Sequence, residues 1–171
     1  GGWAPLPDGW LAKHGARVFG VTRRPEAFAQ PQCTVRMIDS SSTDVARVVR
    51  DETGGHGADI VYNTVGSPYF EAANRAMAHG GRQILIATVE RQVSFDIFQF
   101  YRGRHTYVGV DSLALDACAS AALLRELLPG FTSGQLRPLS VVQSACYPLK
   151  DANDAYRTVH SIAQNRVVLL P

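Results

Sequence analysis

Three consecutive residues, Thr22, Arg23 and Arg24, follow a run of branched and aromatic residues and could bind a phosphate group. Guanidinium groups hold phosphate oxygens bidentately, whereas a carboxylate at a strand end holds a ribose 2′-hydroxyl and repels a 2′-phosphate. No acidic residue stands directly at this point of the chain. If the run 16–22 is a strand of a dinucleotide-binding sheet, NADP is therefore favoured over NAD. The alternative interpretation is a solvated turn with two incidental arginines.

Small and polar residues end two further strand candidates. The run 58–66 contains Thr64 and ends at Gly66, and the run 82–88 ends at Thr88. A threonine hydroxyl can bond to a ribose or an amide, and glycine lets a ligand approach the backbone. Ligands of doubly wound sheets bind outside the carboxyl ends of the strands, so these residues form a candidate cofactor site with residues 22–24. Each of them taken alone is equally typical of a plain strand-to-helix turn.

The elements that would position these residues alternate between β-rich runs and helical patterns. The strand candidates are 16–22, 34–39, 58–66, 82–88, 105–110 and a closing run, 166–171. Two of them, 58–66 and 82–88, have nearly continuous apolar centres, which is typical of strands covered on both faces. The alternation predicts an α/β fold of the Rossmann type, with a doubly wound, mainly parallel sheet and helices on both faces. The closing strand must pair with an earlier strand or with one outside this chain.

Four helices are predicted between the strands. Their expected starts are Ser42 or Thr43 as a cap, Ser67-Pro68, residue 113, and Asp151 as a cap. The expected ends of the first three are Gly54-Gly55, Gly80-Gly81 and Pro129-Gly130. The last helix would turn Ala152, Ala155, Tyr156, Val159 and Ile162 inward.

Composition and spacing argue against several classes of function. The net charge is only +2, without a basic stripe, so nucleic-acid binding is not predicted. No apolar run reaches the roughly 18 residues that cross a bilayer, and we expect a soluble, cytoplasmic protein without a membrane partner. Cys33, Cys118 and Cys146 form no CxxC pair and the histidines have no ligand spacing, so neither a disulfide framework nor a metal site is predicted. No nucleophile elbow or catalytic triad identifies an acid–base residue.

Two stretches resemble the zeta-crystallin-like quinone oxidoreductases of the medium-chain dehydrogenase/reductase superfamily, which is zinc-type alcohol dehydrogenase-like. The first comprises LAKHGARVFGVTRRPE and DETGGHGADIVYNTVGSPYFEAANRAMAHGGRQILIAT. The second comprises FDIFQFYRGRHTYVGVDSLALDACASAALLRELLPGFTSGQLRP, YPLKDANDAYRTV and NRVVLLP. The resemblance covers about residues 11–171. It implies hydride transfer from NADPH to quinones, enones or other activated carbonyl compounds, usually without catalytic zinc.

The resemblance also implies a role for each candidate residue. Thr22, Arg23 and Arg24 would face the adenosine phosphate, and Thr64 and Gly66 would lie near the ribose. Thr88 would lie near the nicotinamide. The nicotinamide carboxamide would pass Val108, Gly109 and Val110.

Domain organisation and assembly follow from the same resemblance. Residues 1–138 would be the Rossmann domain that binds NADP(H). Residues 139–171 would be a segment that returns to a GroES-like catalytic domain, whose strands are missing from this chain. The edge strand 105–110 would pair across a two-fold axis into a homodimer.

Residues 1–10 depart from the family pattern, because two prolines stand where a GxGxxG loop is expected. That departure leaves two alternatives open. One is a non-catalytic Rossmann module used for dimerisation or partner binding, with impaired nucleotide binding. The other is an unrelated Rossmann enzyme, such as a methyltransferase.

Overall fold

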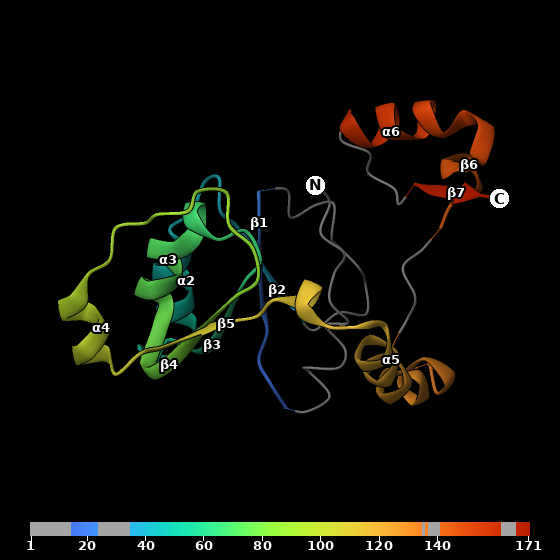
Figure 1. The fold of residues 1–171 in the computed structure, drawn as a ribbon. Helices are drawn as coiled ribbons and strands as arrows, with labels where there is room; N and C mark the ends of the chain where they lie inside the picture. Colours follow the sequence, from blue (N-terminus) through green and yellow to red (C-terminus); the bar gives the residue numbers. More distant parts are fainter. Residues whose placement is uncertain (1–14, 24–34, 135, 137–140, 162–166) are drawn as a thin grey trace. The chain divides into compact units, whose positions relative to one another are not determined.

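The computed structural model describes residues 15–23, 35–134, 136, 141–161 and 167–171 (Figure 1). These residues belong to two compact units. The first, here called the sheet unit, comprises residues 19–23 and 36–123. The second, here called the C-terminal unit, comprises residues 15–18, 35, 124–134, 136, 141–161 and 167–171. Each unit is described by itself.

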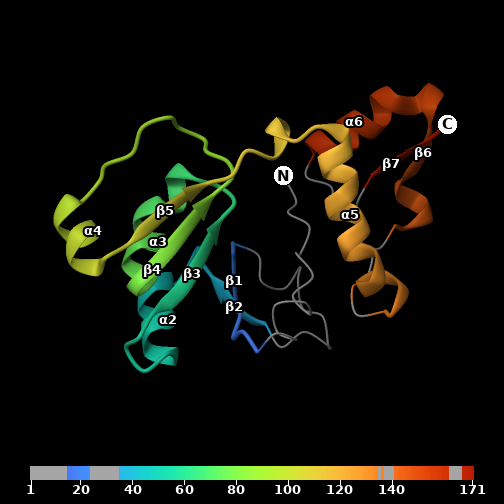
Figure 2. The ribbon, with the colours of Figure 1, turned by 60° about the horizontal axis from the view of Figure 1, so that its bottom comes forward.

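The strands of the sheet unit are all paired in parallel. β1 (Phe19–Thr22) pairs with β2 (Arg36–Asp39), and a second sheet has the order β3-β4-β5, formed by Ala58–Asn63, Met77–Leu85 and Thr106–Gly109 (Figure 2). Parallel strands need crossover connections, and helices provide them between β3 and β4 and between β4 and β5. The prediction of a Rossmann-like α/β fold with parallel sheets is confirmed.

One hydrophobic core joins the two sheets. Ile38 of β2 is buried against α2 (Val45–Glu52) and α3 (Phe70–Ala76), and Phe19 of β1 and Ala58 of β3 pack on the same cluster. A further helix, α4 (Ile97–Gly103), lies between β4 and β5 in the chain and was not predicted. It begins at Asp96, whose carboxylate accepts a hydrogen bond from the backbone N–H of Gln99.

The cap of α2 differs from the prediction. The residue that caps the helix is Asp44, whose carboxylate accepts from the backbone N–H groups of Ala46 at 3.1 Å and Arg47 at 3.3 Å. Neither Ser42 nor Thr43 caps it, because the Ser42 hydroxyl donates instead to Asp39 at 2.9 Å. The predicted end is confirmed: the helix stops at Thr53, and Gly54 and Gly55 follow with positive φ angles.

Two other predicted helix ends are wrong. The short 3₁₀ turn η2 (Ser67–Tyr69) leads into α3, which ends at Ala76 because Met77 already pairs with Ala58 in the sheet. Helix α5 (Ala117–Thr132) continues past Pro129. Proline removes one donor from a helix but keeps its carbonyl, and Pro129 accepts from the N–H of Ser133 at 3.0 Å.

The C-terminal unit contains a small β-α-β arrangement. β6 (Cys146–Pro148) pairs in parallel with β7 (Val168–Leu170), and α6 (Ala152–His160) lies between them in the chain. The closing strand thus finds its partner in an earlier strand. Within this unit Ala155 is buried as predicted, but Tyr156 and Val159 are exposed, so their predicted inward orientation is wrong.

Three single-turn 3₁₀ segments complete the elements: η3 (Ser112–Ala114), η4 (Gln143–Ala145) and η5 (Leu149–Asp151). Asp151 precedes α6 without making a side-chain capping bond. None of the helices in the described ranges combines the length and the apolar character needed to span a membrane.

Candidate functional site

The carboxyl ends of three strands are linked by hydrogen bonds. The backbone N–H of Ser40, just after β2, donates to the carbonyl of Thr22 at the end of β1 at 2.9 Å. The Ser40 hydroxyl lies 3.1 Å from the hydroxyl of Tyr69, and the Tyr69 N–H donates to the carbonyl of Gly66 at 3.1 Å. The ends of β1 and β2 are therefore connected to the turn that follows β3.

Hydrogen bonds also connect the turn after β3 to the segment that follows β4. The N–H of Ser67 donates to the Thr88 hydroxyl at 3.3 Å, and that hydroxyl donates to the carbonyl of Glu90 at 2.5 Å. The N–H of Glu90 donates back to the Ser67 hydroxyl at 3.0 Å. Four strand ends thus form one continuous rim.

Gly66 occupies a position in this rim that requires glycine. Its φ of 85° and ψ of −123° lie in a region that side chains with a Cβ rarely adopt. A Cβ added there would collide with the carbonyl oxygen of Ala87 and with Cα and Cβ of Thr88. Close packing of the β3 and β4 ends therefore explains this glycine, and the space a side chain would fill belongs to Thr88.

A chain of buried amides supports the rim from behind. The Asn63 carboxamide oxygen accepts from the N–H groups of Val65 at 3.2 Å and Gly66 at 2.8 Å, and its Nδ2 donates to the Gly66 carbonyl at 3.0 Å. Asn63 Nδ2 also donates to Gln83 Oε1 at 2.9 Å, and Gln83 Nε2 donates to Asn74 Oδ1 at 2.7 Å. Sequence reasoning missed this network, because amides in apolar runs carry no periodic signal.

Tyr107 of β5 completes the network. Its hydroxyl donates to Asn74 Oδ1 at 3.0 Å, and burial raises the pKa of its phenol above the usual value. Its ring packs among Phe70, Phe95 and Phe100, with ring centroids 5.6, 5.5 and 5.6 Å away respectively. This aromatic cluster anchors the network to α3 and to α4 with its preceding loop.

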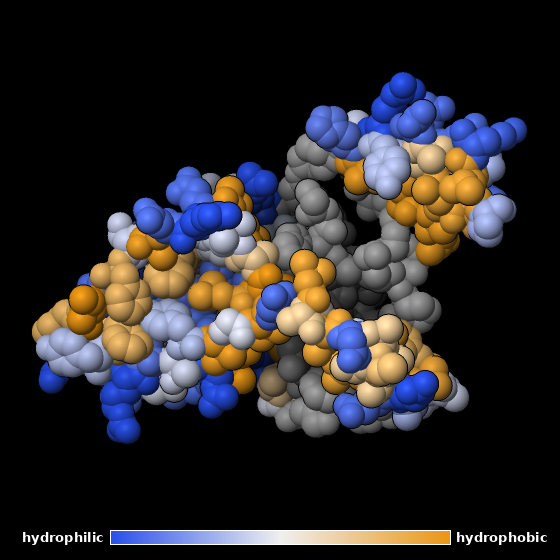
Figure 3. Space-filling view, in the orientation of Figure 1, coloured by the Kyte–Doolittle hydropathy of each residue, from blue (hydrophilic) through white to orange (hydrophobic). Residues whose placement is uncertain are grey.

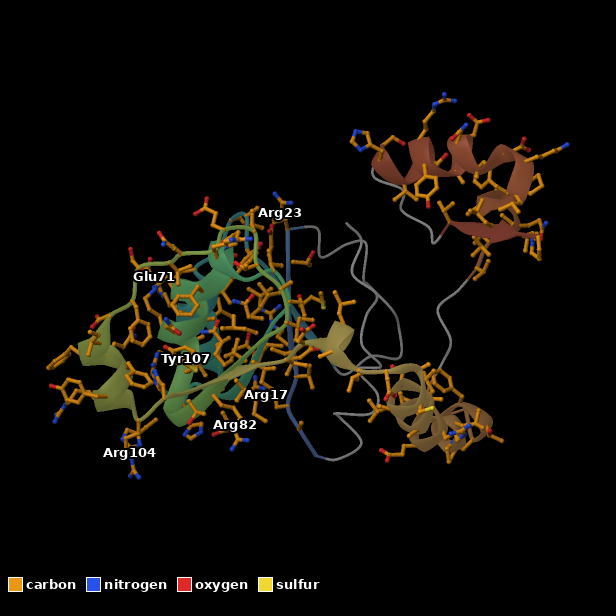
Figure 4. All side chains as sticks on the ribbon, viewed as in Figure 1. Arg17, Arg23, Glu71, Arg82, Arg104 and Tyr107 are labelled. Carbon is orange, nitrogen blue, oxygen red and sulfur yellow. The ribbon has the colours of Figure 1, made fainter. Side chains whose placement is uncertain are left out.

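The described residues predicted for the site all lie at or near the carboxyl ends of the strands. Figure 4 shows Arg23 at the end of β1, where its side chain is exposed and forms no hydrogen bond or ion pair with any part of the chain that the structure describes. Thr64 is half-buried in the turn after β3.

The predicted residues of β5 lie beside the end of β4: Val108 pairs with Ile84 and Gly109 with Leu85. Val110 follows, and its N–H donates to the Leu85 carbonyl at 2.9 Å. Arg24 lies outside the described residues, as do residues 1–10, where the altered GxGxxG position was identified.

Asp39 is a charged residue of the rim that sequence reasoning did not identify. It ends β2 opposite Thr22 in the parallel register. Its carboxylate accepts from the Ser41 hydroxyl at 2.6 Å, the Ser41 N–H at 2.8 Å and the Ser42 hydroxyl at 2.9 Å. These bonds, the Ser41 hydroxyl foremost, hold the pKa of the Asp39 carboxyl below its usual value. A strand-end Asp followed by three serines is the signal that could have revealed it.

The described residues contain no cluster of side chains that could bind a metal ion. Across residues 15–23, 35–134, 136, 141–161 and 167–171, no three side chains among His, Cys, Asp and Glu are grouped so that they could hold an ion. Cys118 and Cys146 are free thiols, and Cys33 lies outside the described residues.

Known proteins are similar in sequence to most of this chain. A family model described as zinc-binding dehydrogenase matches residues 35–164. A mycocerosic acid synthase-like polyketide synthase of Mycobacterium tuberculosis is 33% identical over 124 residues, which make up 71% of this chain and 6% of that protein.

Solved structures extend the likeness over nearly the whole chain. A quinone oxidoreductase of Pseudomonas syringae matches with a TM-score of 0.75 at 25% identity, over 95% of this chain and 51% of that one. The Escherichia coli quinone oxidoreductase, solved in complex with NADPH, matches with a TM-score of 0.75 at 19% identity, over 95% of this chain and 52% of that one. At that identity the second likeness shows the fold alone. The chain spans about half the length of these two proteins and 6% of the polyketide synthase.

Proposed function

Because this chain belongs to the zinc-binding dehydrogenase family, whose members are oxidoreductases, we propose that it binds a nicotinamide dinucleotide for hydride transfer. Family membership confirms the resemblance predicted from the sequence. The observation that carries the proposal is the continuous rim of strand ends from Thr22 through Gly66 to Thr88, with Arg23 exposed beside it. Carboxyl ends of parallel strands are where this kind of sheet binds dinucleotides.

The cofactor in this proposal is NADP(H), held by residues of separate strand ends. Arg23 and Arg24, with Thr22, bind the adenosine phosphate through guanidinium groups that match a phosphate bidentately. Thr64 and Gly66 lie along the ribose. The Thr64 hydroxyl has no hydrogen-bond partner within the described ranges, so it is available to a ribose hydroxyl.

The nicotinamide end is held by Thr88 and by the stretch from Val108 through Gly109 to Val110. The Thr88 hydroxyl already gives its single proton to the Glu90 carbonyl, so towards a carboxamide it acts as an acceptor for the amide N–H. A Cβ added to Gly109 would have nothing within 4 Å, which leaves its backbone open to a ligand. When bound, the cofactor supplies the hydride, while the protein orients its ring and excludes water.

The substrate we propose is a quinone, an enone or another activated carbonyl compound. The match to a quinone oxidoreductase at 25% identity supports this class. The same proposal includes a Rossmann domain formed by residues 1–138. It also includes a substrate pocket formed jointly with a GroES-like domain, to which residues 139–171 return. Cytoplasmic location and independence from zinc stay predictions.

Cofactor preference is tested by replacing Arg23 with alanine. We expect affinity for NADPH to fall about tenfold or more, the value of a lost charge-assisted bond, while affinity for NADH changes little. The measurement is titration calorimetry of the chain with each dinucleotide. Arg82→Ala, which removes an exposed arginine from β4, is the matched control and should leave both affinities unchanged. An equal loss for NADH and NADPH, or no binding of either at millimolar concentration, contradicts the proposal.

Dimerisation is proposed through β5. This strand ends the β3-β4-β5 sheet, so one of its edges has no strand partner among the described residues. Paired edge strands from two copies would continue the sheet, and a lysine on an edge opposes such pairing. We expect Thr106→Lys to shift the chain from dimer to monomer in sedimentation velocity, whereas Thr43→Lys, at an exposed turn, should not. A wild-type chain that sediments as a monomer rejects this assembly.

A further inference from the structure

A cavity of about 560 Å³ lies in the sheet unit at the end where β3, β4 and β5 begin. It is therefore at the opposite end of these strands from the candidate cofactor site. Its basic lining residues come from separate parts of the chain: Arg50 of α2, His56 before β3, His79 of β4, Arg102 of α4 and His105 before β5. Figure 4 shows the neighbouring Arg104 at this end of the unit and Arg23 at the other.

Among the described residues, His56 is the one basic residue of this lining that pairs with a carboxylate. None of the described residues that line the cavity carries a carboxylate. His56 pairs with Asp59 at 2.8 Å, outside the lining. Within the part of the chain that the structure describes, His79 and Arg102 form no hydrogen bond and no ion pair. The cavity thus gathers two guanidinium groups and three imidazoles, with no carboxylate among the described residues of its lining.

Arg50 is held in place by backbone carbonyls and still has donors to offer. Its Nε donates to the Arg75 carbonyl at 2.8 Å, one terminal nitrogen to Met77 at 3.0 Å and the other to Gly55 at 3.3 Å. A guanidinium has five N–H groups, so about two remain for a ligand. A preorganised guanidinium loses little entropy when it binds an oxyanion.

His105 is the buried polar group of the cavity. The residue is only 9% exposed, and its Nδ1 has no hydrogen-bond partner among the described residues. Burial, and then the charges of Arg50 and His79, lower the pKa of its imidazole. A hydrogen bond with the Ala78 backbone acts in the opposite direction and raises this pKa. A bound oxyanion would offset those charges and accept a hydrogen bond from the protonated ring.

An apolar wall adjoins the basic residues. Phe98 of α4 is 65% exposed and lines the cavity with Met77, which is fully buried. Figure 3 shows apolar residues at the surface of α4, where Ile97 is exposed as well. Gly103 lies against the His105 ring, so closely that a Cβ at this position would collide with the ring. An exposed aromatic ring beside a basic cluster suits a ligand that has both an anionic group and an apolar body.

We propose that this cavity is a second ligand site, which binds the phosphate of an organic phosphomonoester and packs its organic part against Phe98. The two arginines, with His79 and His105, suit a dianionic phosphate better than a single carboxylate. The site is independent of the proposed nicotinamide site, because it uses different residues at the other end of the strands.

The test is calorimetric titration of the whole chain with phenyl phosphate, inorganic phosphate and benzoate. We expect phenyl phosphate to bind about three- to tenfold more tightly than inorganic phosphate, the value of one aromatic contact, and benzoate to bind most weakly. Arg102→Gln and His79→Gln change exposed residues, so the fold should tolerate them, and each should weaken phenyl phosphate about tenfold. Arg82→Gln and Arg23→Ala are controls that should leave this binding unchanged.

A second readout does not depend on any variant. In the wild-type chain, the ¹⁵N signals of the His105 imidazole should shift towards the protonated form as phenyl phosphate is added. No binding of phenyl phosphate, or equal weakening by Arg82→Gln, overturns the site. Equal affinity for inorganic and phenyl phosphate overturns the role of Phe98. Loss of NADPH binding in Arg23→Ala with intact phenyl phosphate binding would support both sites separately.

Discussion

Replacing Gly66 with valine is expected to destabilise the sheet unit by about 2 to 6 kcal/mol, of which ~1–3 comes from backbone strain and ~1–3 from overpacking. The strain arises because φ is 85° at this residue. Overpacking arises because the added Cβ meets Ala87 and Thr88 largely at backbone atoms, which cannot move aside cheaply. Urea unfolding followed by circular dichroism measures the change.

Matched glycine variants separate the two contributions. Gly80 also has a positive φ of 77°, but a Cβ there meets nothing within 4 Å, so Gly80→Ala should show the strain alone. Gly109 has neither a positive φ nor a close neighbour, and Gly109→Ala should be nearly neutral. Gly66→Ala should cost more than Gly80→Ala. If Gly66→Ala and Gly80→Ala are equally stable, close packing of the β3 and β4 ends is not what requires glycine at position 66.

The Gly66 variants also bear on the proposed cofactor site. The same turn carries Thr64, and its Ser67 bonds to Thr88, so displacing Thr88 should disturb two strand ends at once. We expect Gly66→Ala to weaken NADPH and NADH alike, in contrast to Arg23→Ala, which should act on NADPH alone. A common loss identifies the turn as a framework for the whole dinucleotide rather than for its phosphate.

Gln83→Leu is expected to cost about 2 to 4 kcal/mol, because it removes two buried hydrogen bonds and leaves their partners with fewer bonds. Gln83 is 0% exposed and lies between Asn63 and Asn74. Each atom that loses Gln83 keeps one other bond, Asn63 Nδ2 to the Gly66 carbonyl and Asn74 Oδ1 to the Tyr107 hydroxyl, which limits the loss. The free energy of unfolding in urea gives the value.

A double-mutant cycle shows whether the network acts as a unit. If it does, Gln83→Leu combined with Asn74→Leu should cost less than the sum of the two single changes, because both single changes break the same Gln83–Asn74 hydrogen bond. Arg82→Gln, at the preceding exposed position of β4, is the matched control and should change stability by less than about 0.5 kcal/mol. Strict additivity would mean that the amide chain does not support the rim cooperatively.

The two ends of the sheet unit offer different chemistry. At the carboxyl ends, backbone groups and hydroxyls are bonded into a rim, and Arg23 and Asp39 bring opposite charges to neighbouring strands. At the amino ends, arginines and histidines surround a cavity without a carboxylate in its lining. A dinucleotide with both sugars and phosphates suits the first arrangement, and a compact phosphate ester suits the second.

Local pattern was sufficient to predict where most strands lie, but not where each one begins and ends. The run 16–22 ends at Thr22 as predicted, whereas β3 ends at Asn63 rather than at Gly66, and β4 covers Met77–Leu85 rather than 82–88. Because these runs are rich in branched apolar residues and are followed by small polar residues, the parallel α/β fold could still be predicted. Helix ends were less predictable. Asp44 rather than its neighbours caps α2, because Ser42 is bonded to Asp39, three residues earlier.

The sequence by itself determined the alternation of strands and helices and the basic residues at the end of β1, because these depend on neighbours within one period of a strand or helix. Only the tertiary structure decided that Gln83 meets Asn63 and Asn74, and that His105 lies with Arg50 at one cavity. Such contacts join residues beyond one helical or strand period, such as Asn74 and Gln83, nine positions apart, and Asn63 and Gln83, 20 positions apart. Their geometry follows from strand register and from the packing of α2 and α4, which no local period encodes.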